Sequence, residues 1–157
     1  MVRERIRGLG ERGFTLAELL VVIAMIGILS ILATPTLISY WNASTLQAGA
    51  EELAAAINRG RQLAIVQNTT VCVHVLFQSI RMRTGGCAGT LYTGPGTSAL
   101  GLISLTSGMQ VSFASGTSVV FTNLGAASPA ATLRVTSPTT GRTRDVVVSA
   151  SGQVRVQ

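Results

Sequence analysis

The feature that most constrains this chain is an apolar run of twenty residues, from Phe14 to Ala33, in which Glu18 is the only charged residue. At about 1.5 Å per residue, a helix of this length spans roughly 30 Å, the thickness of the hydrocarbon core of a bilayer. We therefore predict a single membrane-spanning helix. A carboxylate in the middle of such a helix costs about 2.5 to 3.5 kcal/mol on insertion scales, so Glu18 is a candidate functional residue.

The residues before the run set the expected orientation in the membrane. Residues 1–13 contain four arginines and two glutamates, a formal charge of +2. Because segments rich in arginine stay on the cytoplasmic side, we expect a cytoplasmic N-terminus, one pass through the inner membrane and an exported domain over residues 35–157.

Two simpler interpretations compete for this run. A secretory signal peptide would need small residues before a cut at its end, but Ile31-Leu32-Ala33 places a bulky isoleucine where a small residue is preferred. A plain membrane anchor explains the apolarity and the charge bias but not Glu18, which lies one helical turn after Phe14.

Residues 12–18, RGFTLAE, resemble the N-terminal signature of type IV pilins and of the pseudopilins of type II secretion. In these families a prepilin peptidase cuts after the glycine and N-methylates the new terminal phenylalanine. The resemblance implies removal of residues 1–13 after Gly13, a mature N-terminus at Phe14 and a transmembrane and filament-core helix over residues 14–34. It also implies that Glu18 neutralises the terminal amine of a neighbouring subunit, so other pilins or pseudopilins are the expected partners.

Beyond the membrane, the pattern predicts a helix packed on strands. An apolar stripe at helical spacing runs from Leu46 to Ala64, and residues 67–70, QNTT, end it. Gly27 and Pro35 predict a kink or an unwound turn. Alternation with period two then predicts strands over residues 71–77, 80–83, 102–105, 109–113, 117–121, 132–136, 144–149 and 153–157, with an irregular loop over 85–101. The expected class is α+β, the pilin fold.

Cys72 and Cys87 are the only cysteines, and two cysteines in an exported domain predict a disulfide. A loop of about 15 residues closed in this way contributes about 3 kcal/mol on chain-entropy arithmetic. Two unpaired thiols are the alternative.

The C-terminal half resembles the GspH/FimT group of pilin-like proteins in residues 119–125, VVFTNLG, and 141–149, GRTRDVVVS. Within this group, GspH is a minor pseudopilin of type II secretion, and FimT is a minor type IV pilin linked in some members to DNA uptake through a Gly-Arg-x-Arg motif. Gly141, Arg142 and Arg144 match that motif, with Arg134 and Arg155 as weaker candidates for DNA contact.

The charge of the expected exported domain favours the FimT interpretation. From residue 36 onward there are eight arginines and three acidic residues, a formal charge of +5. The motif is short, however, and Asp145 lies beside it, so a GspH-type pseudopilin that never contacts DNA is the alternative. An enzyme is not expected: His74 is the only histidine, and no base, metal-ligand spacing or cofactor motif accompanies it.

Overall fold

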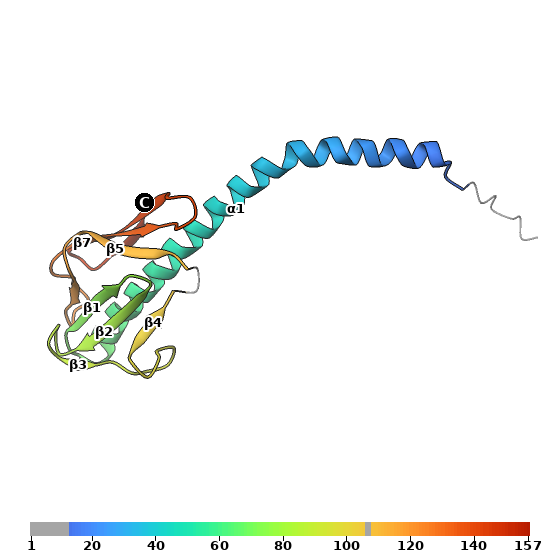
Figure 1. Cartoon of the computed structure of the whole chain (residues 1–157). Helices are drawn as coiled ribbons and strands as arrows, with labels where there is room; N and C mark the ends of the chain where they lie inside the picture. The colour runs from blue at the N-terminus through green and yellow to red at the C-terminus, as the bar shows by residue number, and fades with distance from the viewer. Residues whose placement is uncertain (1–12, 106–107) are drawn as a thin grey trace, which may run out of the picture. The chain divides into compact units, whose positions relative to one another are not determined.

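The computed structural model describes residues 13–105 and 108–157 of the chain. The described residues form two units, one up to Tyr40 and one from Trp41 to Gln157. One helix, α1 (Leu16–Val66), contributes residues to both units (Figure 1). Of the expected leader, only Gly13 lies within the described residues.

The first unit is the apolar half of α1. Its large side chains are exposed, from 43% at Val22 to 77% at Leu16. By length and composition α1 is suited to cross a membrane, with a mean hydropathy of 2.7 over its most apolar window. Apolar side chains exposed along a whole helix require lipid or other helices around them, which agrees with the expected anchor.

The unwound turn, one of the two alternatives expected at Gly27 and Pro35, is absent from this helix, which is the first correction to the sequence prediction. α1 is continuous through both Gly27 and Pro35. The hydroxyl groups of Ser30 and Thr34 donate to the carbonyl oxygens of Ile26 and Ser30, at 2.7 and 2.6 Å. Both hydroxyl groups thereby have a hydrogen-bond partner within the helix itself.

In the second unit, the predicted stripe of α1 is its buried face. The buried residues are Leu46, Gly49, Ala50, Leu53, Ala56, Ile57, Gly60 and Ala64. The helix ends at Val66, directly before the expected QNTT segment. In that segment Asn68 has a left-handed φ of 49°, and its amide donates to the carbonyl of Ile65. A residue in this conformation after the last turn is a common way to end a helix.

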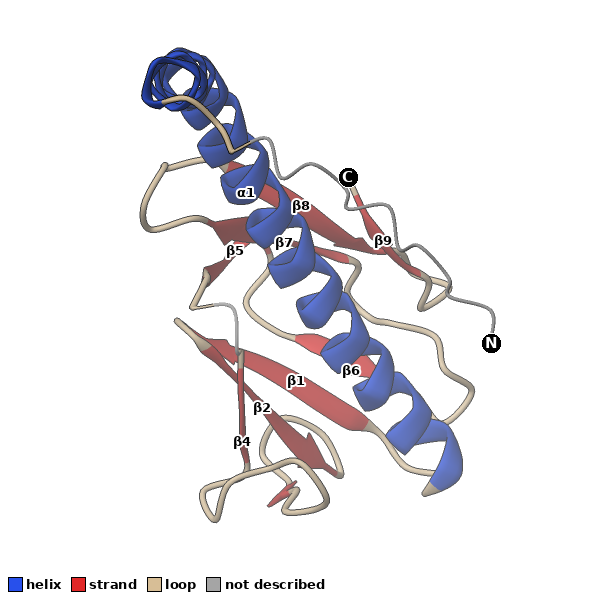
Figure 2. Ribbon diagram, turned by 90° about the vertical axis from the view of Figure 1, so that its right-hand side faces the viewer, coloured by secondary structure: helices blue, strands red, loops and turns tan. Residues whose placement is uncertain are grey.

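Two antiparallel sheets pack against this part of α1, which runs across both (Figure 2). In the first sheet β2 lies between β1 and β3, β1 also pairs with β6, and β4 pairs with the same edge of β2 as β3. Its strands are β1 (Val71–Leu76), β2 (Ser79–Thr84), β3 (Thr90–Leu91), β4 (Leu102–Ser104) and β6 (Val119–Phe121). The second sheet has the order β5-β7-β8-β9, with β5 (Gln110–Ser115), β7 (Ala131–Thr136), β8 (Thr143–Val148) and β9 (Val154–Val156). The α+β pilin architecture is confirmed.

The stretch over residues 85–101 is not entirely irregular, which is the second correction. It contains β3, in which Thr90 pairs with Thr84 of β2 and the two hydroxyl groups lie 2.8 Å apart. The amide of Tyr92 also donates to the carbonyl of Met82 at 3.0 Å. β3 is only two residues long, too short to show a period-two pattern, so the glycine-rich sequence did not indicate it.

The core lies between α1 and the inner faces of the two sheets. Its fully buried large side chains are Leu53 and Ile57 from the helix and Val71, Val73, Ile80, Met82, Val119, Phe121, Leu133, Val135, Val146 and Val148 from the strands. Every one of these residues belongs to the second unit.

Candidate functional site

The residues expected to be processed lie at the start of α1. Gly13 and Phe14 precede the helix, and Phe14 is 79% exposed. The hydroxyl oxygen of Thr15 accepts a 3.2 Å hydrogen bond from the backbone amide of Glu18. Thr15 and Glu18 therefore have the spacing of a capping box, with the carboxylate in the positive first turn of the helix. Sequence reasoning missed this local role, although the Thr-x-x-Glu spacing was a signal for it.

Arg144 is the second residue of β8, and Arg142 directly precedes this strand, at the end of the loop that joins it to β7. Because they are two residues apart on an extended chain, their side chains share the face of the sheet on which Val146 and Val148 are buried. With Thr143 they line a pocket of about 240 Å³, whose other wall is formed by Ala43 and Leu46 of α1. Both arginines are exposed, and neither guanidinium has a partner among the described residues.

Gly141 shapes the loop before this pair of arginines. Its φ is 67°, and its amide donates to the carbonyl of Ser137 at 2.9 Å. The amide of Ser137 in turn donates to the carbonyl of Arg142. A Cβ at Gly141 would meet nothing within 4 Å. The glycine is therefore required by its left-handed backbone and not by a crowded space.

Arg134 and Asp145 form an ion pair on the opposite face of the second sheet. They are cross-strand partners, and Arg134 contacts both carboxylate oxygens through Nε at 2.8 Å and Nη2 at 2.9 Å. The hydrogen bond from Arg134 holds the pKa of Asp145 below its usual value, and the same contact raises the pKa of Arg134. Asp145 is thus engaged by Arg134 and not by the arginines that flank it in sequence.

The weaker candidates for DNA contact do not join Arg142 and Arg144. Arg155 of β9 is the cross-strand partner of Val147, so it shares the outer face with Arg134 and Asp145. Arg142 and Arg144 lie on the face toward α1. The structure therefore separates the five positions predicted from sequence into the motif, Gly141 with Arg142 and Arg144, and two arginines on the other side of the sheet.

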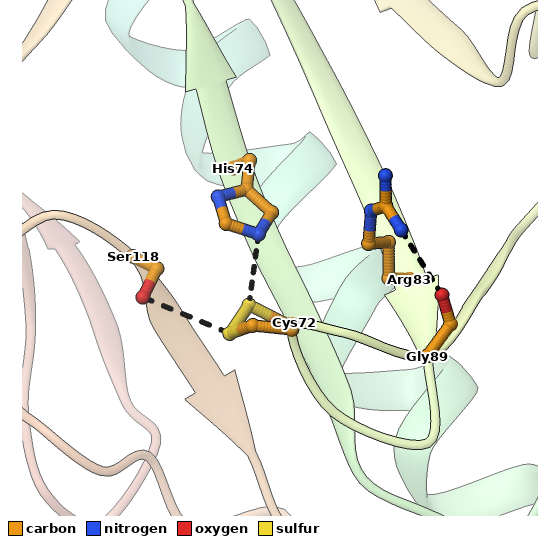
Figure 3. Close-up of a disulfide and its surroundings, with 6 residues drawn as sticks. Cys72, His74, Arg83, Gly89 and Ser118 are labelled. Carbon is orange, nitrogen blue, oxygen red and sulfur yellow. Dashed lines mark hydrogen bonds between the residues drawn. A yellow bond between two sulfur atoms is a disulfide. The ribbon is translucent and has the colours of Figure 1, made fainter.

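The predicted disulfide is present. Cys72 of β1 and Cys87, which follows β2, are bonded, with their Cα atoms 4.9 Å apart. His74 lies beside the bridge, with Nε2 3.4 Å from Cys72 Sγ, and Cys87 Sγ lies 3.8 Å from the hydroxyl of Ser118 (Figure 3). The bridge ties the first strand of the domain to the loop after the second.

Comparison with protein families identifies both parts of the chain. Residues 9–34 match the prokaryotic N-terminal methylation motif. Residues 49–152, about two thirds of the chain, match the family described as type II transport protein GspH. The chain belongs to the GspH family. Comparison with curated protein sequences gives no match.

Solved structures agree with the GspH family in fold. The type IV minor pilin FimU of Pseudomonas aeruginosa is 18% identical, with a TM-score of 0.54 over 75% of this chain and 92% of that one. The minor pseudopilin EpsH from the type 2 secretion system of Vibrio cholerae is 13% identical, with a TM-score of 0.55 over 71% of this chain and 95% of that one. GspH of Escherichia coli is 15% identical, with a TM-score of 0.57 over 73% of this chain and 88% of that one.

Membership of the GspH family, together with the methylation motif, makes the chain a pilin-like structural subunit and not an enzyme. It implies other pilins or pseudopilins as partners in a filament and a prepilin peptidase as the processing enzyme. Pilins and pseudopilins share this fold, so the fold alone does not distinguish a type IV pilus from a type II secretion system.

Proposed function

We propose that the chain is a FimT-type minor type IV pilin that binds DNA without sequence preference through Arg142 and Arg144. In this proposal the peptidase cuts between Gly13 and Phe14, and Glu18 pairs with the terminal amine of a neighbouring subunit. The N-terminus is cytoplasmic, and residues 35–157 are exported and carried on a filament.

The observation that supports DNA contact most strongly is the free state of the two motif arginines. Both guanidinium groups are exposed on one face of β8 with no partner among the described residues. The nearest acidic residue in sequence, Asp145, is held by Arg134 on the other face. Sequence reasoning counted Asp145 against the motif, and this pairing weakens that objection.

The chemistry of the pocket suits phosphate contact and not base recognition. Planar guanidinium groups bind phosphate oxygens through paired hydrogen bonds. The other lining residues are Ala43, Leu46 and Thr143, so no aromatic ring is present in the pocket on which a base could stack. Binding should therefore be weak, independent of sequence and sensitive to salt.

The test is a titration of the full chain, in micelles of an uncharged detergent, with duplex DNA at several salt concentrations. We expect micromolar or weaker binding, with log K falling by about 0.9 per log unit of salt for each phosphate neutralised. Replacing both Arg142 and Arg144 with Gln should lower the affinity and flatten the slope by roughly two.

The control must lower the charge equally without touching the motif. Arg59 and Arg61 are unsuitable, because they donate to the carbonyl oxygens of Pro95 and Gly125. Ala55 and Gln62 are exposed on α1, so Ala55→Glu with Gln62→Glu lowers the net charge by two at another surface. Equal losses from both double variants would indicate unspecific attraction, and absence of binding at low salt would contradict the proposal.

The second candidate is a GspH-type minor pseudopilin, which acts as a structural or priming subunit near the tip of a secretion filament. The match of residues 49–152 to the GspH family supports it. In that case the chain should either not bind DNA or bind it equally well after substitution of Arg142 and Arg144. Loss of the subunit should impair protein secretion.

A further inference from the structure

The hairpin of β1 and β2 gathers basic side chains on its outer face. His74 is the cross-strand partner of Arg81, and Cys72 is the partner of Arg83. Directly opposed residues in an antiparallel pair point to the same side, so these four side chains form one block. The alternate positions of the same strands, Val73 and Met82 among them, face the core.

This block lines a pocket of about 370 Å³, formed by His74, Val75, Leu76, Arg81, Arg83 and Cys87. Arg83 is held in place because its Nη1 donates to the carbonyl of Gly89 at 3.1 Å, and His74 stands beside it over the disulfide (Figure 3). The disulfide to the buried Cys72 fixes Cys87 at the edge of the pocket. The pocket thus has two walls that are fixed before any ligand arrives.

One donor group of Arg81 lacks an acceptor. The Nε of Arg81 is buried and has no hydrogen-bond partner among the described residues. A buried N–H without a partner is unfavourable, and more so when the group is charged, so such groups indicate a missing acceptor. Sequence reasoning did not single out Arg81 or Arg83, because their approach to His74 depends on the register of the hairpin.

The charge around the pocket determines what kind of acceptor fits. Its lining contains two guanidinium groups and no carboxylate. Beyond residue 35, the only acidic residues in the sequence are Glu51 and Glu52 of α1 and Asp145, which is paired with Arg134. The pocket therefore carries a net positive charge.

A cation is the less suitable occupant, although three potential metal-ligating groups meet here. The ligand atoms of Cys72, His74 and Cys87 lie within 4.8 Å of one another. Both sulfur atoms are used by the disulfide, so neither is a thiolate, the form in which cysteine binds metals. Arg81 and Arg83 would also repel a cation.

We propose that Arg81, Arg83 and His74 form a phosphate-binding pocket on the outer face of the β1–β2 hairpin. The site shares no residue with the pocket of Arg142 and Arg144 and does not depend on the function proposed for that pair. Its ligand is a phosphate group, taken either as the free ion or as a phosphodiester of a nucleic acid. Arg81 supplies its guanidinium group, and Arg83 supplies the guanidinium nitrogens that Gly89 leaves free.

The test is calorimetric titration of the full chain in uncharged micelles with inorganic phosphate, at an ionic strength held constant with chloride. We expect a dissociation constant on the order of 1 mM. Arg81→Gln should weaken binding about tenfold or more, and Arg83→Gln severalfold. Gln62→Glu, the control with the same change of charge, should change it by less than about twofold.

Arg81→Lys covers the case in which Arg81→Gln does not fold. It keeps the charge and the aliphatic stem but loses the planar fork, so binding should weaken by an intermediate amount. Thermal unfolding and an intact disulfide establish that each variant is folded. Absence of phosphate binding, an equal loss in Gln62→Glu, or tighter binding of acetate than of phosphate would overturn the proposal.

A short single-stranded oligonucleotide distinguishes the two sources of phosphate. If it displaces inorganic phosphate and its own affinity falls in Arg81→Gln, the ligand is a phosphodiester. If it leaves phosphate binding unchanged, the ligand is the free ion. The variant with both Arg142 and Arg144 replaced by Gln separates this result from DNA binding at the other pocket.

Discussion

What separates one arginine of this domain from another is its partner. Arg134 is held by Asp145, while Arg59 and Arg61 bind backbone carbonyl groups. Arg142 and Arg144 have no partner among the described residues, and Arg81 has a buried donor without an acceptor. At this scale, functional candidates are the charged groups whose interactions within the domain are incomplete.

Glu18 provides the residue-scale prediction. Replacing it with Ala keeps the amide that donates to Thr15, so α1 should still begin at the same place. Membrane insertion should be unchanged or improved because a buried carboxylate is removed, yet incorporation into filaments should fall sharply. The measurement compares the variant in sheared filaments and in membranes. Glu18→Gln, which keeps the shape without the charge, should also fail, and normal assembly of both variants would contradict a role for the charge.

At the scale of elements, local periodicity predicted most of the fold. The buried face of α1 and the strand pattern from Val71 were evident because side chains alternate with characteristic periods. β3 was not evident, because two residues are too few to show a period. The division into two sheets was not evident either, because it depends on which strands pair. Of the kink or unwound turn expected near Pro35, the unwound turn is excluded, because α1 is continuous through this residue.

Gly60 provides the element-scale prediction, because α1 packs against β1 there with no room for a side chain. A Cβ there would lie 2.8 Å from Cγ2 of Val73, inside the core. Gly60→Ala should therefore destabilise the domain by about 1 to 3 kcal/mol despite the better helix propensity of alanine. Gly27→Ala is the matched control, since a Cβ there meets nothing within 4 Å. Thermal unfolding measures the stability of both variants. Equal unfolding midpoints for Gly60→Ala and Gly27→Ala would show that α1 can move away from β1 at no cost in stability.

At the scale of the whole molecule, the candidate sites were only partly predictable. The motif of Gly141, Arg142 and Arg144 was evident as four letters, and the structure adds its exposure and its free guanidinium groups. The basic face of the β1–β2 hairpin was not evident, because its residues come together only through cross-strand register. The processing site at the N-terminus, in contrast, was predictable from sequence, because the order of the seven residues RGFTLAE is enough to indicate it.

The central claim is that the apolar segment remains on the mature protein as the helix that joins filament subunits. The intact mass of the protein isolated from membranes tests it directly. We predict a chain that begins at Phe14, carries one N-methyl group and ends at Gln157. Gly13→Ala, which adds a side chain at the cleavage site, should retain residues 1–13 in a larger fraction of the protein. A mature chain that begins at Thr34, after the apolar run, would contradict the account.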